Sequence, residues 1–245
     1  QTVPSNSIES ALFLESDRMG NLLGAVTQDK LTNQIGVVQN EKRQGDNQPY
    51  GLTRYITNSV LYPEGHPYHH STIGSMEDLS NASLDDMKMW FTDHYAPNNA
   101  VLVLAGDTSV AEAKPLAEQW FGRFPAGKPL PEVVAPVPTL AEKRQVVIHD
   151  RVPNTRIHYV WAVPGLNDPE FVPLAAGAHA LGGLASSRLD NILVRDEKLA
   201  VSVSAYVQPF VHASLYTVTV TVAPGQDADM VAKRLDEIMT DFWTS

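Results

Sequence analysis

The sequence predicts an α+β protein built from two units of similar size, and three observations carry that prediction. Helical patterns of apolar residues dominate the first 125 residues. A stretch at 126–143 is rich in proline and has no apolar period, which is typical of an extended linker. After it, helices and alternating strands come in blocks rather than in strict alternation, which favours antiparallel sheets over a parallel α/β fold.

The first unit is expected to be mainly helical. Amphipathic spacing predicts helices over 5–26, 29–44, 51–62, 75–95 and 110–125. Ser75 and Ser83 are each followed three residues later by Asp, which predicts two N-caps within 75–95. The apolar run from Ala100 to Ala105, closed by Gly106-Asp107, predicts a buried strand.

The second unit is expected to hold two pairs of strands separated and followed by helices. Strands are predicted over 145–150, 155–163, 201–208 and 214–222, and helices over 171–183, 186–200 and 227–243. The first unit shows only helices and one late strand, as if its opening strands were missing. We therefore expect the chain, which begins at Gln1 without an initiator Met, to be an internal fragment of a longer protein. The predicted domains are the C-terminal portion of one domain at 1–125, a linker at 126–143 and the N-terminal portion of a second domain at 144–245.

Composition excludes several classes of function. The net charge of −10 and the absence of a basic stripe argue against nucleic acid as a partner, and no apolar run reaches the roughly 20 residues that span a membrane. With no cysteine, the chain forms no zinc finger, no disulfide and no thiol nucleophile. Cysteine avoidance favours a periplasmic or otherwise extracytoplasmic location.

One carboxylate stands out from the helical pattern. Leu31, Ile35 and Val38 form an apolar stripe, and Glu41 takes its next position. Burying a carboxylate among apolar residues is costly unless a cation compensates it. Either the stripe ends there and Glu41 reaches water, or Glu41 has a cationic partner.

Four segments, in order along nearly the whole chain, resemble one protein family. The segments are "ALFLESDRMGNLL", "VVQNEKRQGDNQPYG", "GHPYHHSTIGSMEDLSNASLDDMKMWFTDHYAPNNAVLVLAGD" and "ALGGLASSRLDNILVRDEKLAVSVSA". They look like parts of the insulinase, pitrilysin and mitochondrial processing peptidase family of zinc peptidases. The resemblance implies repeated two-layer α+β domains with antiparallel-rich sheets and packed helices, which enclose an unfolded peptide.

The family's zinc site combines an inverted H-x-x-E-H motif with a Glu on a second helix. Glu41 in "QNEKRQ" matches that third ligand, so the resemblance implies zinc as the partner of the oddly placed carboxylate. The chain contains no H-x-x-E-H, so it should not hydrolyse peptides alone, and zinc is expected only in the full-length protein. A supporting Glu that the family often has seven residues earlier is replaced by Gln34.

The second domain of active relatives often carries an Arg and a Tyr seven residues apart. Val194 and Val201 occupy the aligned positions here, while Arg195 lies one residue away and is the candidate substrate-binding residue. The implied partners are a peptide or unfolded protein substrate and the remaining part of the same protein or a homologous subunit. The function is thus part of a zinc-dependent endopeptidase or, alternatively, a non-catalytic peptidase-like scaffold or partner subunit.

Three other patterns fit ordinary structural roles better than functional sites. His66, His69 and His70 have H-x-x-H spacing, but Pro67 interrupts it and no acidic ligand is close, so a solvated turn is favoured over a metal site. "GGLASSRL" lacks the ending of a phosphate-binding loop, and its small residues fit a helix junction better. Ser186 and Ser187 lack the G-x-S-x-G setting of a nucleophile.

Overall fold

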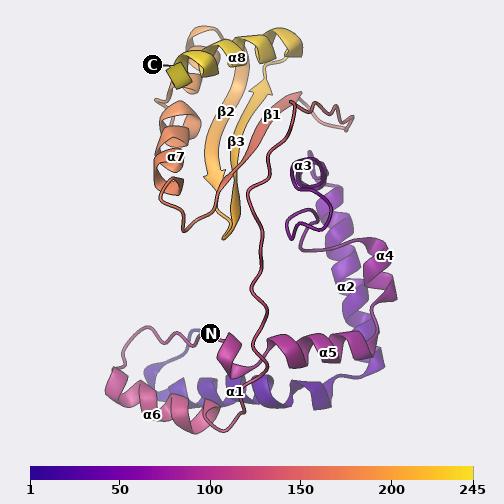
Figure 1. The fold of residues 1–245 in the computed structure, drawn as a ribbon, viewed down its shortest axis with the longest axis vertical. Helices are drawn as coiled ribbons and strands as arrows, with labels where there is room; N and C mark the ends of the chain where they lie inside the picture. Colours follow the sequence, from indigo (N-terminus) through magenta and orange to yellow (C-terminus); the bar gives the residue numbers. More distant parts are fainter. Residues whose placement is uncertain (245) are drawn as a thin grey trace. The chain divides into compact units, whose positions relative to one another are not determined.

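The computed structural model describes residues 1–244 and divides the chain into two compact units. The first comprises 1–43 and 73–133, and the second comprises 44–72 together with the residues from Val134 on. The helices and strands labelled in Figure 1 are α1 (Ile8–Ala25), α2 (Gln28–Asp46), α3 (Thr53–Leu61), α4 (Met76–Asn81), α5 (Leu84–His94), α6 (Val110–Phe121), β1 (Arg156–Pro164), α7 (Phe171–Ala178), β2 (Ala200–Gln208), β3 (Ala213–Val222) and α8 (Ala228–Thr244). Four short helical segments complete the elements: η1 (Ser5–Ser7), η2 (Pro97–Asn99), η3 (His179–Gly183) and η4 (Asp190–Asp196).

Helices α4 and α5 begin directly after the predicted capping serines. Ser75 accepts a hydrogen bond from the Asp78 amide at the start of α4, and Ser83 forms a reciprocal capping box with Asp86 at the start of α5. Hydrogen bonding to Ser83 lowers the pKa of the Asp86 carboxyl. The two N-caps predicted within 75–95 are therefore confirmed.

Packing between the helices of the first unit is sparse. α1 and α6 meet edge to face through Phe13 and Trp120, whose ring centroids lie 5.2 Å apart, and the Gln119 amide donates to Glu9. The side chain of Gln39 on α2 donates to Ser80 on α4 at 3.0 Å. Among the described residues of this unit, only Leu12 and Ser16, both on α1, are fully buried.

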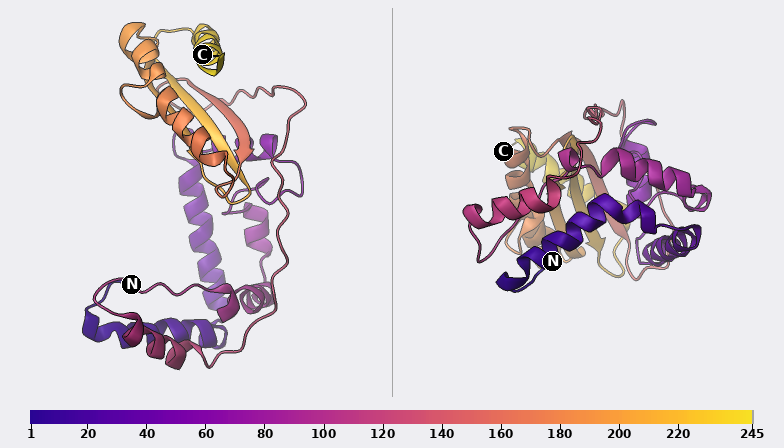
Figure 2. Two further views of the ribbon diagram at one scale, coloured as in Figure 1. Left: turned by 60° about the vertical axis from the view of Figure 1, so that its left-hand side comes forward. Right: turned by 90° about the horizontal axis from the view of Figure 1, so that it is seen from below.

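The second unit contains a three-stranded antiparallel sheet in the order β1-β3-β2. Central strand β3 alternates strictly, with Val218 and Val220 on one face and Thr217 and Thr219 on the other. α7, the segments η3 and η4, and α8 pack on the apolar face (Figure 2, left). The strand predictions for 155–163, 201–208 and 214–222 are confirmed, because alternation and β-branched residues mark half-buried strands well.

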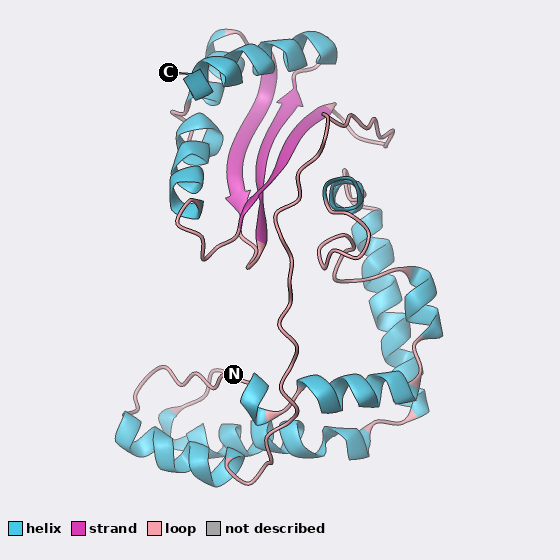
Figure 3. Cartoon of the chain, in the orientation of Figure 1, coloured by secondary structure: helices cyan, strands magenta, loops and turns pink. Residues whose placement is uncertain are grey.

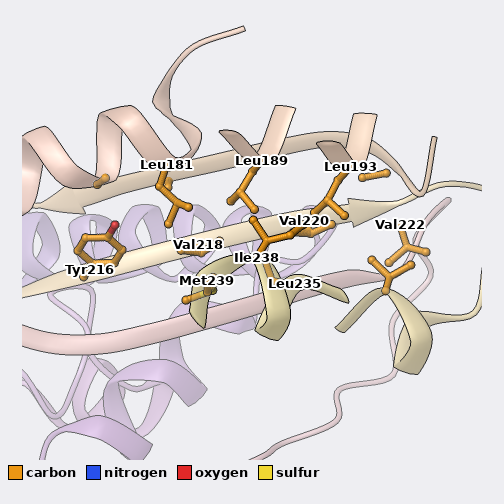
Figure 4. Close-up of a cluster of buried hydrophobic side chains, with 14 residues drawn as sticks. Leu181, Leu189, Leu193, Tyr216, Val218, Val220, Val222, Leu235, Ile238 and Met239 are labelled. Carbon is orange, nitrogen blue, oxygen red and sulfur yellow. The ribbon is translucent and has the colours of Figure 1, made fainter. Parts of the chain in front are cut away.

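The main core lies between this sheet and its helices. Figure 4 shows side chains from η3, η4 and α8 converging on Val218 and Val220. Leu181, Leu189, Leu193, Val218, Val220, Val231 and Leu235 are each 0% exposed. A smaller core on the opposite face joins Leu61 and Tyr62 to Ala213 and Leu215.

Two predicted strands are absent, and one predicted helix has a different winding. Residues 100–105 and 145–150 form no ladder and are drawn as loop in Figure 3, so those strand predictions are wrong for this chain. A strand needs a hydrogen-bonding partner, and apolar sequence alone does not supply one. In the stretch predicted to be helical at 186–200, the structure has the π-helical turns of η4.

The predicted linker contains the division between the two units. In this stretch the units divide between Val133 and Val134, and residues 126–143 have no regular helix or strand. The structure also groups residues 44–72 with the second unit. The predicted limits of the whole protein's domains, 1–125 and 144–245, stay a prediction.

Candidate functional site

Glu41 lies on α2 with its side chain exposed to solvent. Leu31, Ile35 and Val38 are only half-buried, so the apolar stripe does not enclose the carboxylate, and α2 holds no fully buried residue. Within residues 1–244, no hydrogen bond or ion pair engages Glu41. Its carboxylate therefore carries no desolvation cost in this chain and is available to a ligand.

The residues around Glu41 are held by short-range contacts. Arg43 donates to Asn40 at 2.6 Å, while Gln39 reaches Ser80 on α4. These bonds involve the residues on both sides of Glu41 and leave its own side chain free to point outward.

The chain beyond α2 is fixed by a tight turn at Tyr50-Gly51. Tyr50 has a φ of 63°, a conformation that costs energy for a residue other than glycine. Its hydroxyl donates to the Asn154 carbonyl at 2.6 Å, its amide donates to Asp150 at 3.1 Å, and Arg156 lies 3.7 Å over its ring. These contacts anchor the turn to the residues that precede and begin β1, a role that the sequence patterns did not reveal.

Gly51 is needed at that turn for steric reasons. A Cβ there would meet the Gly45 carbonyl oxygen at 2.3 Å and the Gln48 carbonyl oxygen at 2.9 Å. The only signal in the sequence is the "PYG" triplet, which marks a turn without revealing its anchors.

Arg195 lies on η4 and points away from the core, whereas its neighbour Val194 packs against the core. Its Nε donates to Asp190 at 3.3 Å, and its Nη2 donates to the Ala185 carbonyl. The side chain remains 57% exposed. Arg195 thus ties down the loop before η4, and its Nη1 makes no bond within residues 1–244.

The loop that precedes η4 is built from small residues for a packing reason. A Cβ at Gly182 would lie 2.9 Å from the Cβ of Ala205 on β2, so the glycine allows η3 to approach the sheet closely. Ser187 is buried and donates to the Leu184 carbonyl at 2.6 Å. The segment "GGLASSRL" joins the helical segments η3 and η4, so the predicted helix junction is confirmed.

Two of the three histidines of "GHPYHH", His66 and His69, are held by hydrogen bonds within the second unit, whereas His70 is exposed. His66 accepts from the Tyr68 amide at 3.1 Å, so its other ring nitrogen donates to the Pro136 carbonyl at 3.2 Å. His69 donates to the Tyr62 carbonyl at 2.6 Å, and Tyr62 donates its hydroxyl to Ala213 at 3.0 Å. Both nitrogens of His66 are therefore occupied, and this geometry serves packing rather than metal binding.

No grouping of three or more His, Cys, Asp or Glu side chains suited to a metal ion occurs in the described part of the chain. Glu41 is thus a single candidate ligand, and a zinc ion would need further ligands from outside this chain. Glu41 belongs to the first unit and Arg195 to the second.

None of the helices in residues 1–244 has the length and hydropathy required to cross a bilayer.

Comparison with known proteins identifies a family to which the chain is similar. The family described as "Peptidase M16 inactive domain" matches residues 81–242. The zinc protease PqqE of Helicobacter pylori is 27% identical over 242 residues, which cover 94% of this chain and 52% of that protein. The chain therefore spans about half the length of that curated relative.

Solved structures agree with the fold. The crystal structure of a protease from Helicobacter pylori matches with a TM-score of 0.80 and 25% identity, covering 98% of this chain and 58% of that one. The first half of the periplasmic protease PqqL from Escherichia coli matches with a TM-score of 0.69 and 18% identity, covering 91% of this chain and 48% of that one. The second match concerns the fold alone.

Proposed function

Since the chain belongs to the Peptidase M16 inactive domain family, we propose that it is part of a zinc-dependent endopeptidase. The family match over residues 81–242 carries this proposal, and the relationship to a zinc protease of Helicobacter pylori supports it. The chain contributes one zinc ligand and part of a substrate-binding surface. The other ligands come from the remaining part of the same protein or from a homologous subunit.

Glu41 is the proposed ligand. Its carboxylate is exposed and unengaged within residues 1–244, and carboxylate oxygen is an accepted zinc ligand. Zinc, when bound, polarises a carbonyl group and makes its water a better nucleophile. A single carboxylate does not hold such an ion, so the residues of this chain by themselves do not fit a zinc site.

Arg195 is the proposed substrate-binding residue. Asp190 and the Ala185 carbonyl fix its guanidinium, which keeps donors on Nη1 for a carbonyl or carboxylate oxygen of a peptide. In the three-stranded sheet, β1 and β2 are edge strands to which an extended peptide could add. The expected substrate is accordingly a peptide or an unfolded protein held in an enclosed chamber.

The proposed location is periplasmic or otherwise extracytoplasmic. It is supported by the absence of cysteine and by the fold shared with a periplasmic protease of Escherichia coli.

The test is Glu41→Gln in the full-length gene product, which keeps the size of the side chain and removes its charge. An amide oxygen is a poorer zinc ligand, so we expect bound zinc to fall at least about tenfold and peptide cleavage to fall with it. Glu118→Gln is the matched control, because Glu118 makes only a long, exposed contact to Lys114 at 3.8 Å. Full zinc and full turnover in Glu41→Gln would remove Glu41 from the site.

A non-catalytic scaffold or partner subunit is the second candidate. It is favoured by Val194 and Val201, which stand where the related sequences often have an Arg and a Tyr. A full-length protein with no zinc and no peptidase activity, in wild type as in Glu41→Gln, would establish this alternative.

A further inference from the structure

The helix that carries Glu41 begins in the first unit and ends in the second. Its residues after Arg43 are grouped with the second unit, and its last residue is Asp46. Asp46 lies about 7.5 Å beyond Glu41 along the helix axis, at about 1.5 Å per residue. Since α2 holds no fully buried residue, packing alone does not fix it. Contacts that hold the end of α2 therefore also set the position of the Glu41 carboxylate.

Two tyrosines bind the end of α2 within the second unit. Tyr55 on α3 donates its hydroxyl to the Asp46 carboxylate at 2.7 Å. Tyr50, in the turn that follows α2, donates its hydroxyl to the Asn154 carbonyl at 2.6 Å. Asn154 in turn donates its side-chain amide to the carbonyl of Val222, the buried last residue of β3, at 3.1 Å. A chain of hydrogen bonds thus joins this turn to the core strand of the second unit.

The backbone conformation of Tyr50 indicates that its side chain has a purpose beyond the shape of the turn. Tyr50 and Lys198, with φ of 63° and 54°, are the two residues other than glycine within 1–244 that have a positive φ. Glycine adopts this conformation without strain, and strain kept at another residue is offset by its contacts. For Tyr50 these contacts are the hydroxyl bond and the Arg156 guanidinium, 3.7 Å over its ring. A glycine would keep the turn and lose both contacts.

We propose that Tyr50 is a positioning residue that fixes the end of α2, and with it the Glu41 carboxylate, to the sheet of the second unit. The role of Glu41 rests on the proposed function, whereas the anchor rests on the contacts of Tyr50 alone. The second unit then acts on the candidate site through the helix, although it supplies no proposed ligand. Loss of the anchor should loosen the last turn of α2 and leave the sheet folded.

Amide hydrogen exchange of Tyr50→Gly in the full-length gene product tests the anchor. We expect amides 42–46 to exchange at least about tenfold faster than in the wild type, because a hydrogen bond and a cation–π contact are lost, and amides 218–222 to keep their rates. Lys198→Gly is the matched control, because the exposed Lys198 side chain makes no hydrogen bond or ion pair within residues 1–244. Unchanged exchange at 42–46 in Tyr50→Gly, or equal acceleration in both variants, would overturn the proposal.

Asp150→Ala tests the anchor from its other side. It removes the acceptor of the Tyr50 amide, 3.1 Å away, and leaves Tyr50 itself intact. We expect amides 42–46 to exchange at least about threefold faster, since one hydrogen bond is lost. Unchanged exchange in this variant together with unchanged exchange in Tyr50→Gly would show that the turn does not hold α2.

Peptide cleavage by the full-length protein separates positioning from stability. In Tyr50→Gly we expect kcat to fall at least about tenfold with KM unchanged, because a displaced catalytic group affects the transition state more than substrate binding. Val220→Ala weakens the core of the second unit and should keep kcat at a temperature at which it stays folded. An unchanged kcat in an active protein whose amides 42–46 have loosened would overturn the positioning role. Loosening in a protein without peptidase activity would refute the proposed function and leave the anchor standing.

Discussion

The two units of the chain use similar sequence patterns with different results. In the second unit, the alternation of β3 and the stripe of α8 meet in a core whose central leucines and valines are fully buried (Figure 4). In the first unit, α2, α4, α5 and α6 hold no fully buried residue, and Trp90 on α5 is 61% exposed. Apolar periodicity thus indicates which face of a helix or strand can be buried, but burial also requires a second apolar surface that packs against that face. Four predictions test this contrast, from the largest expected effect to the smallest.

A matched pair of valines should show the contrast most strongly. Val220→Ala removes two methyl groups from a side chain that is 0% exposed, and we expect it to lower the free energy of unfolding by about 2 kcal/mol. Val103→Ala removes the same groups from a side chain that is 76% exposed, so the expected change is within about 0.5 kcal/mol. Urea unfolding of the 245-residue chain gives both values. Equal losses would mean that Val103 is buried in solution.

Two glycine-to-alanine variants, one in the turn that follows α2 and one within α2, should change stability in opposite directions. Gly51→Ala places a Cβ 2.3 Å from a carbonyl oxygen and should destabilise the chain by more than about 1 kcal/mol. Gly36→Ala lies within α2, where nothing stands within 4 Å of a new Cβ, and should stabilise it by about 0.5–1 kcal/mol. Thermal unfolding of both variants is the measurement. A stabilising Gly51→Ala would contradict the geometry of the turn.

The pH dependence of stability should report on His158 of β1. Burial, and next the charge of Arg156, lower the pKa of this imidazole in the folded state. The unfolded chain then binds the proton more tightly, so stability is full above about pH 6.5 and falls as the pH drops below that value, by at most about 1.4 kcal/mol per pH unit. His158→Gln should flatten this slope, whereas His149→Gln, at an exposed position, should keep it. An unchanged slope in His158→Gln would assign the dependence to other groups.

Limited proteolysis should mark the predicted linker. We expect the first cuts within or beside residues 126–143, which have no regular structure, and a resistant fragment that contains β1 to α8. We expect the protease to cut also within residues 100–105, which have no regular structure. A first cut within β3, with 126–143 intact, would refute the predicted boundary.

The sequence alone was sufficient to predict those elements that depend on local pattern. The caps at Ser75 and Ser83 and the alternating strands β2 and β3 needed only neighbours along the chain or in an adjacent strand. It was insufficient at residues 100–105 and 145–150, where apolar composition indicated a strand and no ladder forms within residues 1–244. The anchors of Tyr50 also escaped prediction, because Asp150 and Asn154 lie about a hundred residues away.

The candidate site residues also differ in how far the sequence alone reveals them. Glu41 could be singled out because it takes the next position of an apolar stripe, but the structure leaves its carboxylate exposed to solvent. Arg195 could be found only through resemblance, and the bonds that orient it to Asp190 and Ala185 depend on π-helical turns that sequence periodicity does not predict.

Amide exchange across the 245-residue chain tests the central contrast most directly. We expect amides of β3 and α8 to exchange only on global unfolding, and amides of α2, α4, α5 and α6 to exchange at least about 100-fold faster through local opening. Equal protection in the two units would contradict it, because the first unit would then possess a core of its own.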